Sequence, residues 1–319
     1  MNKILITGGS GFVGTNIIEY YKNDFEVLNL DNKAPRNKAH LPYWKNVDLL
    51  DEQKTLELFK AFQPDFVFHM GARTDLDGKT LKDYAANIEG VENIIKAISL
   101  TNSIKKVIFA SSRLVCEIGY VPKDEFDYKP STVYGESKII GEKIVRESKI
   151  LNKDWIIVRP TSLWGPWFDV PYKSFFDSIN KKIYIHPKGL EIRKKFGFVE
   201  NCVYIMDKLI YDNKLNEQTV YLSDFKTLEV KQWADIISQK FHGKKVKSVP
   251  ILILKLLAKI GDILKVLGYN SPPITSFRLN NIITTMDYDT SEVEEVVGDL
   301  PYSLEEATTI TYNWYKAQG

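Results

Sequence analysis

The segment Lys3-Ile4-Leu5-Ile6-Thr7-Gly8-Gly9-Ser10-Gly11-Phe12-Val13-Gly14 joins a short apolar run to a glycine cluster. The apolar run predicts a buried strand, and the apolar residues at helical spacing from Phe12 to Tyr21 predict a helix. Glycines between such elements let the backbone approach a pyrophosphate closely, and the helix N-terminus offers its amides to the phosphates. The spacing of Gly8, Gly11 and Gly14, with an acidic residue about 20 positions later, is typical of a dinucleotide-binding turn.

That acidic residue is Asp31, which follows a second strand predicted over residues 26–30. A carboxylate at this point can accept hydrogen bonds from both ribose hydroxyls of an adenosine, and it would repel a 2′-phosphate. Asp31 therefore favours NAD over NADP as the cofactor. Lys33 and Arg36 lie just beyond and keep NADP open, because either cation could bind a 2′-phosphate.

Strands and helices alternate through the first half of the 319-residue chain. After a loop predicted over residues 31–46, we expect helices at 51–62, 81–100 and 134–150, and strands at 66–69 (the third), 106–110 and 155–158. This alternation predicts an α/β fold with a Rossmann-type, doubly wound parallel sheet. We expect a cofactor domain over residues 1–160 and a smaller α/β substrate domain over 161–319, with residues of about 196–225 returning to the sheet.

Composition excludes several classes of function. The net charge of +2 without a basic block supplies no case for nucleic-acid binding. Two cysteines, Cys116 and Cys202, are too few for a disulfide framework, which favours a reducing cytoplasm. Residues 3–6 are too short for a signal-peptide core, so secretion is not expected. The four histidines lack metal-ligand spacing, and no metal site is expected. We expect His69 to be a packed residue and His186 to lie in a loop.

The most apolar stretch, residues 249–267, is predicted to be an amphipathic helix. Lys255, Lys259, Asp262 and Lys265 recur in it at helical spacing, which argues against a membrane span. The favoured interpretation is a helix that covers the second domain. Peripheral contact with a membrane or a partner stays open, and with it a lipid-linked sugar as substrate.

A tyrosine and a lysine four residues apart, Tyr134 and Lys138, share one face of the helix predicted over 134–150. The same spacing occurs at Tyr184/Lys188, Tyr204/Lys208 and Tyr312/Lys316, but only Tyr134 begins a helix between two sheet strands. A strand ending in Ala110, Ser111 and Ser112 precedes it. A lysine ammonium and an oxidised nicotinamide would both lower the pKa of the tyrosine, which could then act as a base while Ser112 holds the substrate oxygen.

These motifs together resemble the extended short-chain dehydrogenase/reductase family, in its NAD-dependent sugar-nucleotide epimerase/dehydratase branch. The resemblance covers almost the whole chain. Besides the segments above, it rests on Asp48-Leu49, His69-Met70-Gly71-Ala72, Asn87-x-x-Gly90-x-x-Asn93, Arg159-Pro160-Thr161 and Trp164-Gly165-Pro166.

The resemblance implies a role for each matched residue. Ser112, Tyr134 and Lys138 would be catalytic, and Asn87 would organise the catalytic strands. Ser162 and the pair Arg193 or Lys194 would contact the substrate, with Thr74 as a further candidate. The cofactor would contact Gly8, Gly11, Phe12, Val13, Asp31, Asp48, Leu49, Met70, Gly71, Ala72, Asn87, Ala110, Tyr134, Lys138 and Pro160. Family members also commonly dimerise through a contact that includes the Tyr134 helix, which implies a homodimer.

Departures from the family pattern narrow the activity. Dehydratases carry an Asp-Glu pair after the catalytic hydroxyl residue, where this chain has Arg113-Leu114. Fucose-synthase-type members have a cysteine two residues after the serine, whereas Cys116 lies four after Ser112. Ser162 replaces an asparagine that holds a substrate phosphate in many members. The resemblance thus implies a cytoplasmic NAD-dependent epimerase that acts on a nucleotide-linked sugar through a keto-sugar. The alternative is a net NAD(P)-dependent reductase or dehydrogenase of a keto-sugar or other carbonyl compound.

Overall fold

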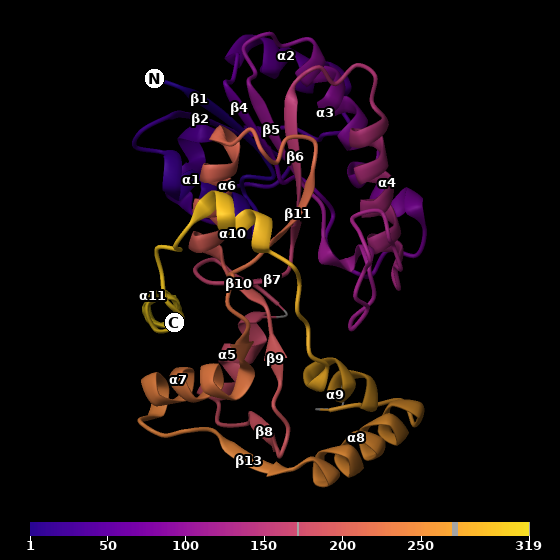
Figure 1. Ribbon diagram of the computed structural model, residues 1–319, viewed down its shortest axis with the longest axis vertical. Coiled ribbons are helices and arrows are strands. Elements are labelled where there is room, and N and C mark those ends of the chain that lie inside the picture. Colours follow the sequence, from indigo (N-terminus) through magenta and orange to yellow (C-terminus); the bar gives the residue numbers. More distant parts are fainter. Residues whose placement is uncertain (171, 270–273, 319) are drawn as a thin grey trace.

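A parallel sheet of seven strands forms the upper half of the molecule (Figure 1). The computed structural model describes residues 1–170, 172–269 and 274–318. The strand order is β11-β6-β5-β4-β1-β2-β3, so the chain reverses direction across the sheet between β1 and β4. The strands are β1 (Lys3–Thr7), β2 (Glu26–Asp31), β3 (Trp44–Asn46), β4 (Phe66–His69), β5 (Lys106–Ala110), β6 (Asp154–Pro160) and β11 (Thr219–Leu222).

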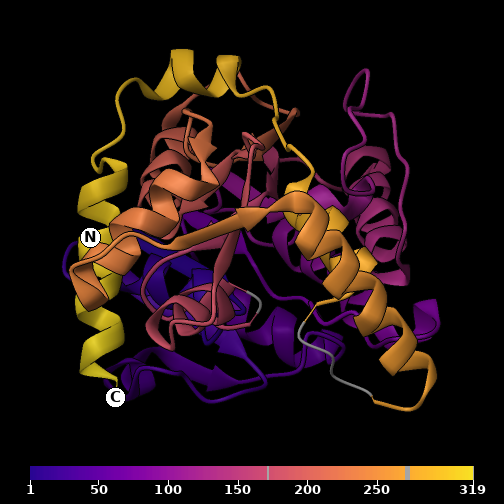
Figure 2. The same ribbon diagram turned by 90° about the horizontal axis from the view of Figure 1, so that it is seen from below.

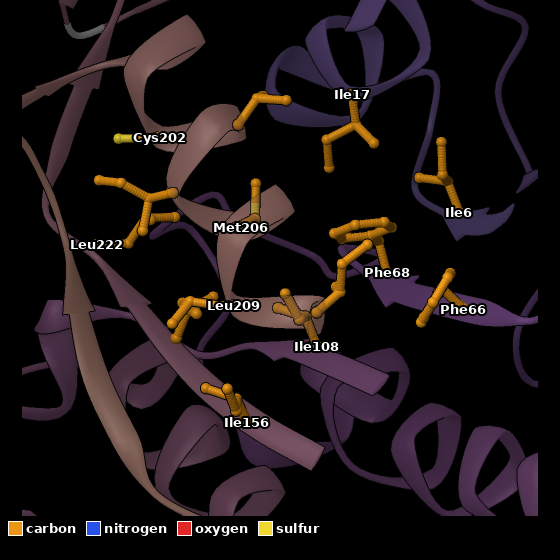
Figure 3. Packing of buried hydrophobic residues seen from close by; sticks show 14 of the residues in the cluster. Ile6, Ile17, Phe66, Phe68, Ile108, Ile156, Cys202, Met206, Leu209 and Leu222 are labelled. Atoms are coloured by element: carbon orange, nitrogen blue, oxygen red, sulfur yellow. The ribbon is translucent and has the colours of Figure 1, made fainter. Parts of the chain in front are cut away.

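Helices cover both faces of this sheet because its strands alternate apolar side chains to both sides. Ile4 and Ile6 of β1 point to one face, where α1 (Phe12–Tyr21), α6 (Val199–Tyr211) and α10 (Ser291–Val297) pack. Leu5 points to the other face, toward α2 (Glu52–Phe62), α3 (Glu89–Ser99) and α4 (Val133–Glu147). Figure 3 shows the first of these cores, with Met206 and Leu209 of α6 packed over Phe68 and Ile108 of the sheet.

The lower half of the molecule is built from three two-stranded sheets and five helices (Figure 1). Its core is aromatic, with Trp164 and Trp233 buried at a centroid distance of 4.8 Å. The paired strands are β7 (Ser162–Trp164) with β10 (Phe196–Phe198), β9 (Arg193–Lys194) with β12 (Leu228–Glu229), and β8 (Ile185–Lys188) with β13 (Lys247–Pro250). The helices are α5 (Tyr172–Asn180), α7 (Val230–His242), α8 (Ile251–Val266), α9 (Ser276–Ile283) and α11 (Leu304–Ala317).

Four local predictions were wrong. The expected loop at 31–46 contains a 3-10 helix (Lys38–Tyr43) and strand β3, so Phe66–His69 is the fourth strand rather than the third. The helix expected over 81–100 is split at Ile88, whose dihedral angles are not helical, into a 3-10 helix (Leu81–Asn87) and α3.

The other two corrections concern the lower half. His186 lies in β8 instead of a loop, because the following Pro187 sits in a two-stranded sheet where few backbone donors are required. The apolar segment starts its helix at Ile251, since Val249 and Pro250 belong to β13. Within the described ranges, no helix has the length and apolar character needed to cross a bilayer.

Candidate active site

The glycine turn between β1 and α1 forms one wall of the site, at the switch point of the sheet. Gly8 has a φ of +70°, and a Cβ there would lie 2.7 Å from the backbone of Gly71. A Cβ on Gly14 would lie 2.3 Å from the carbonyl oxygen of Gly8. No side chain caps α1 at Gly11, so the amides of its first turn, including those of Phe12 and Val13, face outward for a ligand.

Asp31 ends β2 next to this turn. Its carboxylate accepts hydrogen bonds from the amides of Ser10, at 3.1 Å, and Lys33, at 2.9 Å. Burial raises the pKa of Asp31, while these amides oppose the shift. Arg36 is engaged elsewhere, because its Nη1 donates to the carbonyl oxygen of Trp167 at 3.2 Å and lies 3.4 Å from Asp169. The arrangement leaves Asp31 as the carboxylate at the end of β2, with the cation Lys33 two residues beyond it.

Residues from β4 and the loops beside it continue the same wall. Thr7 holds this region, since its Oγ1 accepts from the amide of Gly71 at 3.1 Å and lies 2.7 Å from Nδ1 of His69. Burial, followed by the charge of Lys138, lowers the pKa of His69 to about 3, so this buried histidine is neutral. The remaining cofactor candidates follow strand ends or lie beside them: Asp48 and Leu49 after β3, Met70 and Ala72 after β4, Ala110 at the end of β5 and Pro160 at the end of β6.

Asn87 connects this wall to α4. Its side-chain amide donates to the carbonyl oxygen of Arg73, at 3.0 Å, and to Oγ of Ser137, at 2.9 Å. Its Oδ1 accepts from the amide of Arg73 at 2.8 Å. Asn87 therefore fixes the segment after β4 against the helix that carries Tyr134 and Lys138.

Tyr134 and Ser112 meet at the centre of the site, and both are less than a tenth exposed. Burial raises the pKa of Tyr134, and the nearby hydroxyl of Ser112 opposes that shift. The neighbouring Ser111 instead lies beside Glu142. The position of Ser112 beside Tyr134 is consistent with the choice of Ser112 over Ser111 made from the sequence. Ser112 also accepts a hydrogen bond from the amide of Leu114 at 3.1 Å.

Lys138 lies one turn along α4 from Tyr134 and is also buried. Burial lowers the pKa of its ammonium to about 8, and Glu142 partly opposes this. Near neutral pH the group therefore keeps a positive charge in a desolvated position. This is the charge that can stabilise a tyrosine phenolate nearby.

The substrate candidates divide into buried and exposed residues. Ser162 is buried in β7, where its Oγ accepts from the hydroxyl of Tyr172 at 2.5 Å. Lys194 is buried in β9 and donates to the carbonyl oxygen of Asn281 at 2.7 Å. Arg193 is exposed and paired with Glu191 at 2.5 Å, and Thr74 is exposed in the loop after β4. Of the pair expected to bind a pyrophosphate, Lys194 is the one turned into the protein.

Sequence reasoning missed a further cation, Arg113, which it treated only as the absence of a dehydratase acid. Arg113 follows Ser112 directly, and its Nη1 is buried without a hydrogen-bond partner. Burial and then the charge of Arg113 lower the pKa of Lys194 to about 8, so the two cations lie within electrostatic reach. Arg113 also opposes the burial-driven rise in the pKa of Tyr288. A charged residue next to the catalytic serine is the signal that could have pointed to this site.

Comparison with known proteins matches the chain to one protein family and to an epimerase of similar length. Residues 4–221 match the model of the NAD dependent epimerase/dehydratase family. The N-acetyl-alpha-D-glucosaminyl-diphospho-ditrans,octacis-undecaprenol 4-epimerase of Escherichia coli O157:H7 is 24% identical over 327 residues, covering 99% of this chain and 97% of the relative.

Solved structures show the same fold. A UDP-glucose 4-epimerase from Thermotoga maritima, solved with UDP-glucose, superposes with a TM-score of 0.75 at 18% identity and covers 99% of both chains. The Bordetella bronchiseptica enzyme WbmG, solved with NAD and UDP, gives a TM-score of 0.74 at 22% identity over 99% of this chain and 94% of that one.

Proposed function

The chain belongs to the NAD-dependent epimerase/dehydratase family, and we propose that it inverts one carbon of a nucleotide-linked sugar through a keto-sugar. The observation that carries this proposal is the buried contact between Tyr134 and Ser112, with Lys138 one turn along the same helix. Arg113 and Leu114 stand where a dehydratase would carry its acid and base, which favours epimerisation over water elimination.

The residues around the glycine turn fit NAD. A Cβ at Gly8 would fill the space beside Gly71, the first turn of α1 lacks a side-chain cap, and Asp31 ends β2 where a ribose would lie. When bound, NAD would accept a hydride from the sugar carbon and later return it. Gly8, Gly11, Phe12 and Val13 would hold its pyrophosphate, Asp31 its ribose, and Pro160 would lie against its nicotinamide.

The side chains of the site would transfer the proton of the sugar hydroxyl. Tyr134 would remove the proton of the sugar hydroxyl while the hydride leaves the same carbon, and Ser112 would donate a hydrogen bond to the oxygen. Burial raises the pKa of Tyr134. The positive charges of Lys138 and of the oxidised cofactor would together lower that pKa enough for a phenolate to form. Tyr134 would return the proton when the hydride comes back to the opposite face of the carbon.

The substrate diphosphate would lie between Arg113 and Lys194. Lys194 is buried and the Nη1 atom of the half-buried Arg113 is buried without a hydrogen-bond partner, so two cations that repel each other favour an anion between them. These two cations would bind the diphosphate itself. They would not distinguish a nucleotide from another group attached to that diphosphate. A sugar linked to a polyprenyl diphosphate is therefore a second candidate substrate, favoured by the substrate named for the full-length E. coli relative.

The test is to incubate the purified protein, without added cofactor, with UDP-, GDP- and dTDP-sugars and with N-acetylglucosaminyl-diphospho-undecaprenol in detergent. We expect a new product of unchanged mass from one of them. Tyr134→Phe should lower kcat/KM by about 10²–10⁴-fold, the usual contribution of a general acid-base group. Tyr204→Phe is the matched control, because Tyr204 has the same spacing to Lys208 on the outer part of α6 and should leave activity unchanged.

Turnover that requires stoichiometric NAD(P) or NAD(P)H, with a product changed by two hydrogens, would instead establish the net dehydrogenase or reductase. Full activity in Tyr134→Phe would show that Tyr134 is not the base.

We also propose a homodimer, a cytoplasmic location and a peripheral membrane contact through residues 249–267. We further propose that residues 1–160 chiefly hold the cofactor and residues 161–319 chiefly hold the substrate. The burial of Lys194 in β9 supports this division, and the pairing of β11 with β6 is the point where residues 219–222 return to the cofactor sheet.

A further inference from the structure

Helix α8 presents an apolar face that nothing in the described part of the chain covers. It lies at the edge of the molecule farthest from the seven-stranded sheet (Figure 1), and the view from below places it in front of the other elements (Figure 2). Leu252, Leu256 and Ile263 are 74%, 62% and 60% exposed. Contiguous exposed apolar surface of this kind marks a binding surface on a soluble domain.

The exposed residues form one continuous stripe along α8. At 100° per residue all of them except Val266 fall within an arc of about 140°, and Val266 lies about 40° beyond one edge of that arc. The members of this stripe are Leu252, Ile253, Leu256, Leu257, Ile260, Ile263, Leu264 and Leu267. The opposite side of the helix is narrow and buried, with Leu254 and Ala258 packed against Leu279 of α9. The helix is thus held to the protein by one side and leaves its broader apolar side outward.

The charge around this stripe is almost entirely positive. Residues 244–265 include Lys244, Lys245, Lys247, Lys255, Lys259 and Lys265, against one carboxylate, Asp262. Asp262 is itself occupied, since it accepts a hydrogen bond from the amide of Ser276 at 3.0 Å. Lys255 and Lys259 lie one helical turn apart along one edge of the stripe, beside Leu252 and Ile263. A second copy of the chain docked through the same face would bring lysines toward lysines, which disfavours a homotypic contact.

We propose that this stripe docks α8 on an anionic phospholipid membrane, with the helix in the plane of the interface. The apolar side chains would enter the boundary between headgroups and acyl chains, and the lysines would bind anionic headgroups. The docked face is close to the substrate side of the site, because α8 packs on α9 and the α9 residue Asn281 accepts the hydrogen bond of Lys194. The docking does not depend on which reaction the site performs.

The experiment is co-sedimentation of the full chain with vesicles of phosphatidylcholine, with and without phosphatidylglycerol. We expect binding to the anionic vesicles that weakens with salt and is much weaker on neutral vesicles. The triple variant Leu252→Glu, Leu256→Glu, Ile263→Glu should lower the partition coefficient by tenfold or more, because it replaces three apolar side chains that would enter the membrane with carboxylates.

The matched control is Leu100→Glu, Val121→Glu, Ile150→Glu, which adds the same charge at residues 50%, 76% and 53% exposed outside α8. This control should lose only the small electrostatic part of binding. Equal losses in the two triple variants, or a wild-type chain that stays in the supernatant with anionic vesicles, would overturn the proposal. A dimer in light scattering that the α8 triple variant alone converts to monomers, without vesicle binding by the wild type, would assign the stripe to a second copy instead.

Discussion

The proposed diphosphate site holds two cations, Lys194 and Arg113. Lys194 is buried and Arg113 is half-buried, whereas Arg193, adjacent to Lys194, is exposed and paired with Glu191. A buried, desolvated cation binds a diphosphate far more strongly than an exposed one that is already paired. The two adjacent residues of β9 are therefore expected to contribute unequally to substrate binding.

Lys194→Met should raise the KM for the diphosphate sugar about tenfold, since a hydrogen bond to a charged group contributes about 1.5–3 kcal/mol. The value of kcat should change little, because Lys194 acts on the diphosphate and not on the reacting carbon. Steady-state kinetics measure both parameters. Arg193→Gln is the control and should leave KM within about twofold of the wild type, as expected for an exposed ion pair. An unchanged KM in Lys194→Met, or an equal rise in Arg193→Gln, would contradict this assignment.

At the scale of elements, a buried ion pair fixes α4 against the sheet. Arg159 of β6 donates from Nε and Nη2 to the carboxylate of Glu142 in α4, at 2.8 Å and 2.7 Å, and both residues are almost completely buried. The hydroxyl of Tyr128 donates to the same carboxylate at 2.9 Å. Glu142 lies one turn beyond Lys138 on the helix. The pair therefore sets how α4 presents Tyr134 and Lys138 to the end of β5.

Glu142→Gln should lower the free energy of unfolding at pH 7 by about 3–5 kcal/mol, because it leaves Arg159 charged and unpaired in the interior. Although burial would raise the pKa of Glu142, Arg159 lowers it below its usual value. A lowered pKa means that the stabilisation is complete above the unfolded-state value near 4.5 and is lost as the pH falls through the folded-state value. Denaturant titrations should therefore show the difference between variant and wild type shrinking below about pH 4.5.

The exposed pair Glu117 and Lys129 provides the control for this measurement. Their atoms approach to 2.7 Å at the surface, and Glu117→Gln should cost less than about 1 kcal/mol at any pH. A cost for Glu142→Gln that equals the surface value, or that grows as the pH falls, would show that the buried pair does not hold α4 in place.

At the scale of the whole molecule, the fold could be predicted from the sequence because local pattern and tertiary role agree in its first half. The apolar runs that form β1, β4 and β5 are buried on both faces. The glycine turn brings the backbone of Gly8 so close to that of Gly71 that a side chain would not fit. Short elements such as β3 escaped prediction because three residues, which here follow Pro42 closely, carry no periodicity. The sequence left the choice between Arg193 and Lys194 open, since these adjacent residues differ in which way tertiary packing turns them.

The lower half of the molecule shows the same limit more strongly. Its small sheets pair segments far apart in sequence, such as β8 with β13, and no local pattern encodes such a partner. The proposed role of Arg113 in diphosphate binding likewise depends on tertiary packing, which places Lys194 of β9 near it. The apolar segment at 249–267 was recognisable as amphipathic, but which of its two sides is exposed followed only from its packing on α9.

In the proposed reaction a carbon of the substrate is inverted by a hydride that leaves it for the cofactor and then returns. The most direct measurement is to run the conversion in D₂O, return the product to H₂O, and determine its mass. The hydride never enters solvent, so we expect a product with no deuterium on carbon. A product heavier by one carbon-bound deuterium would show that a proton is removed and replaced from water, and would contradict the mechanism assigned to Tyr134, Ser112 and Lys138.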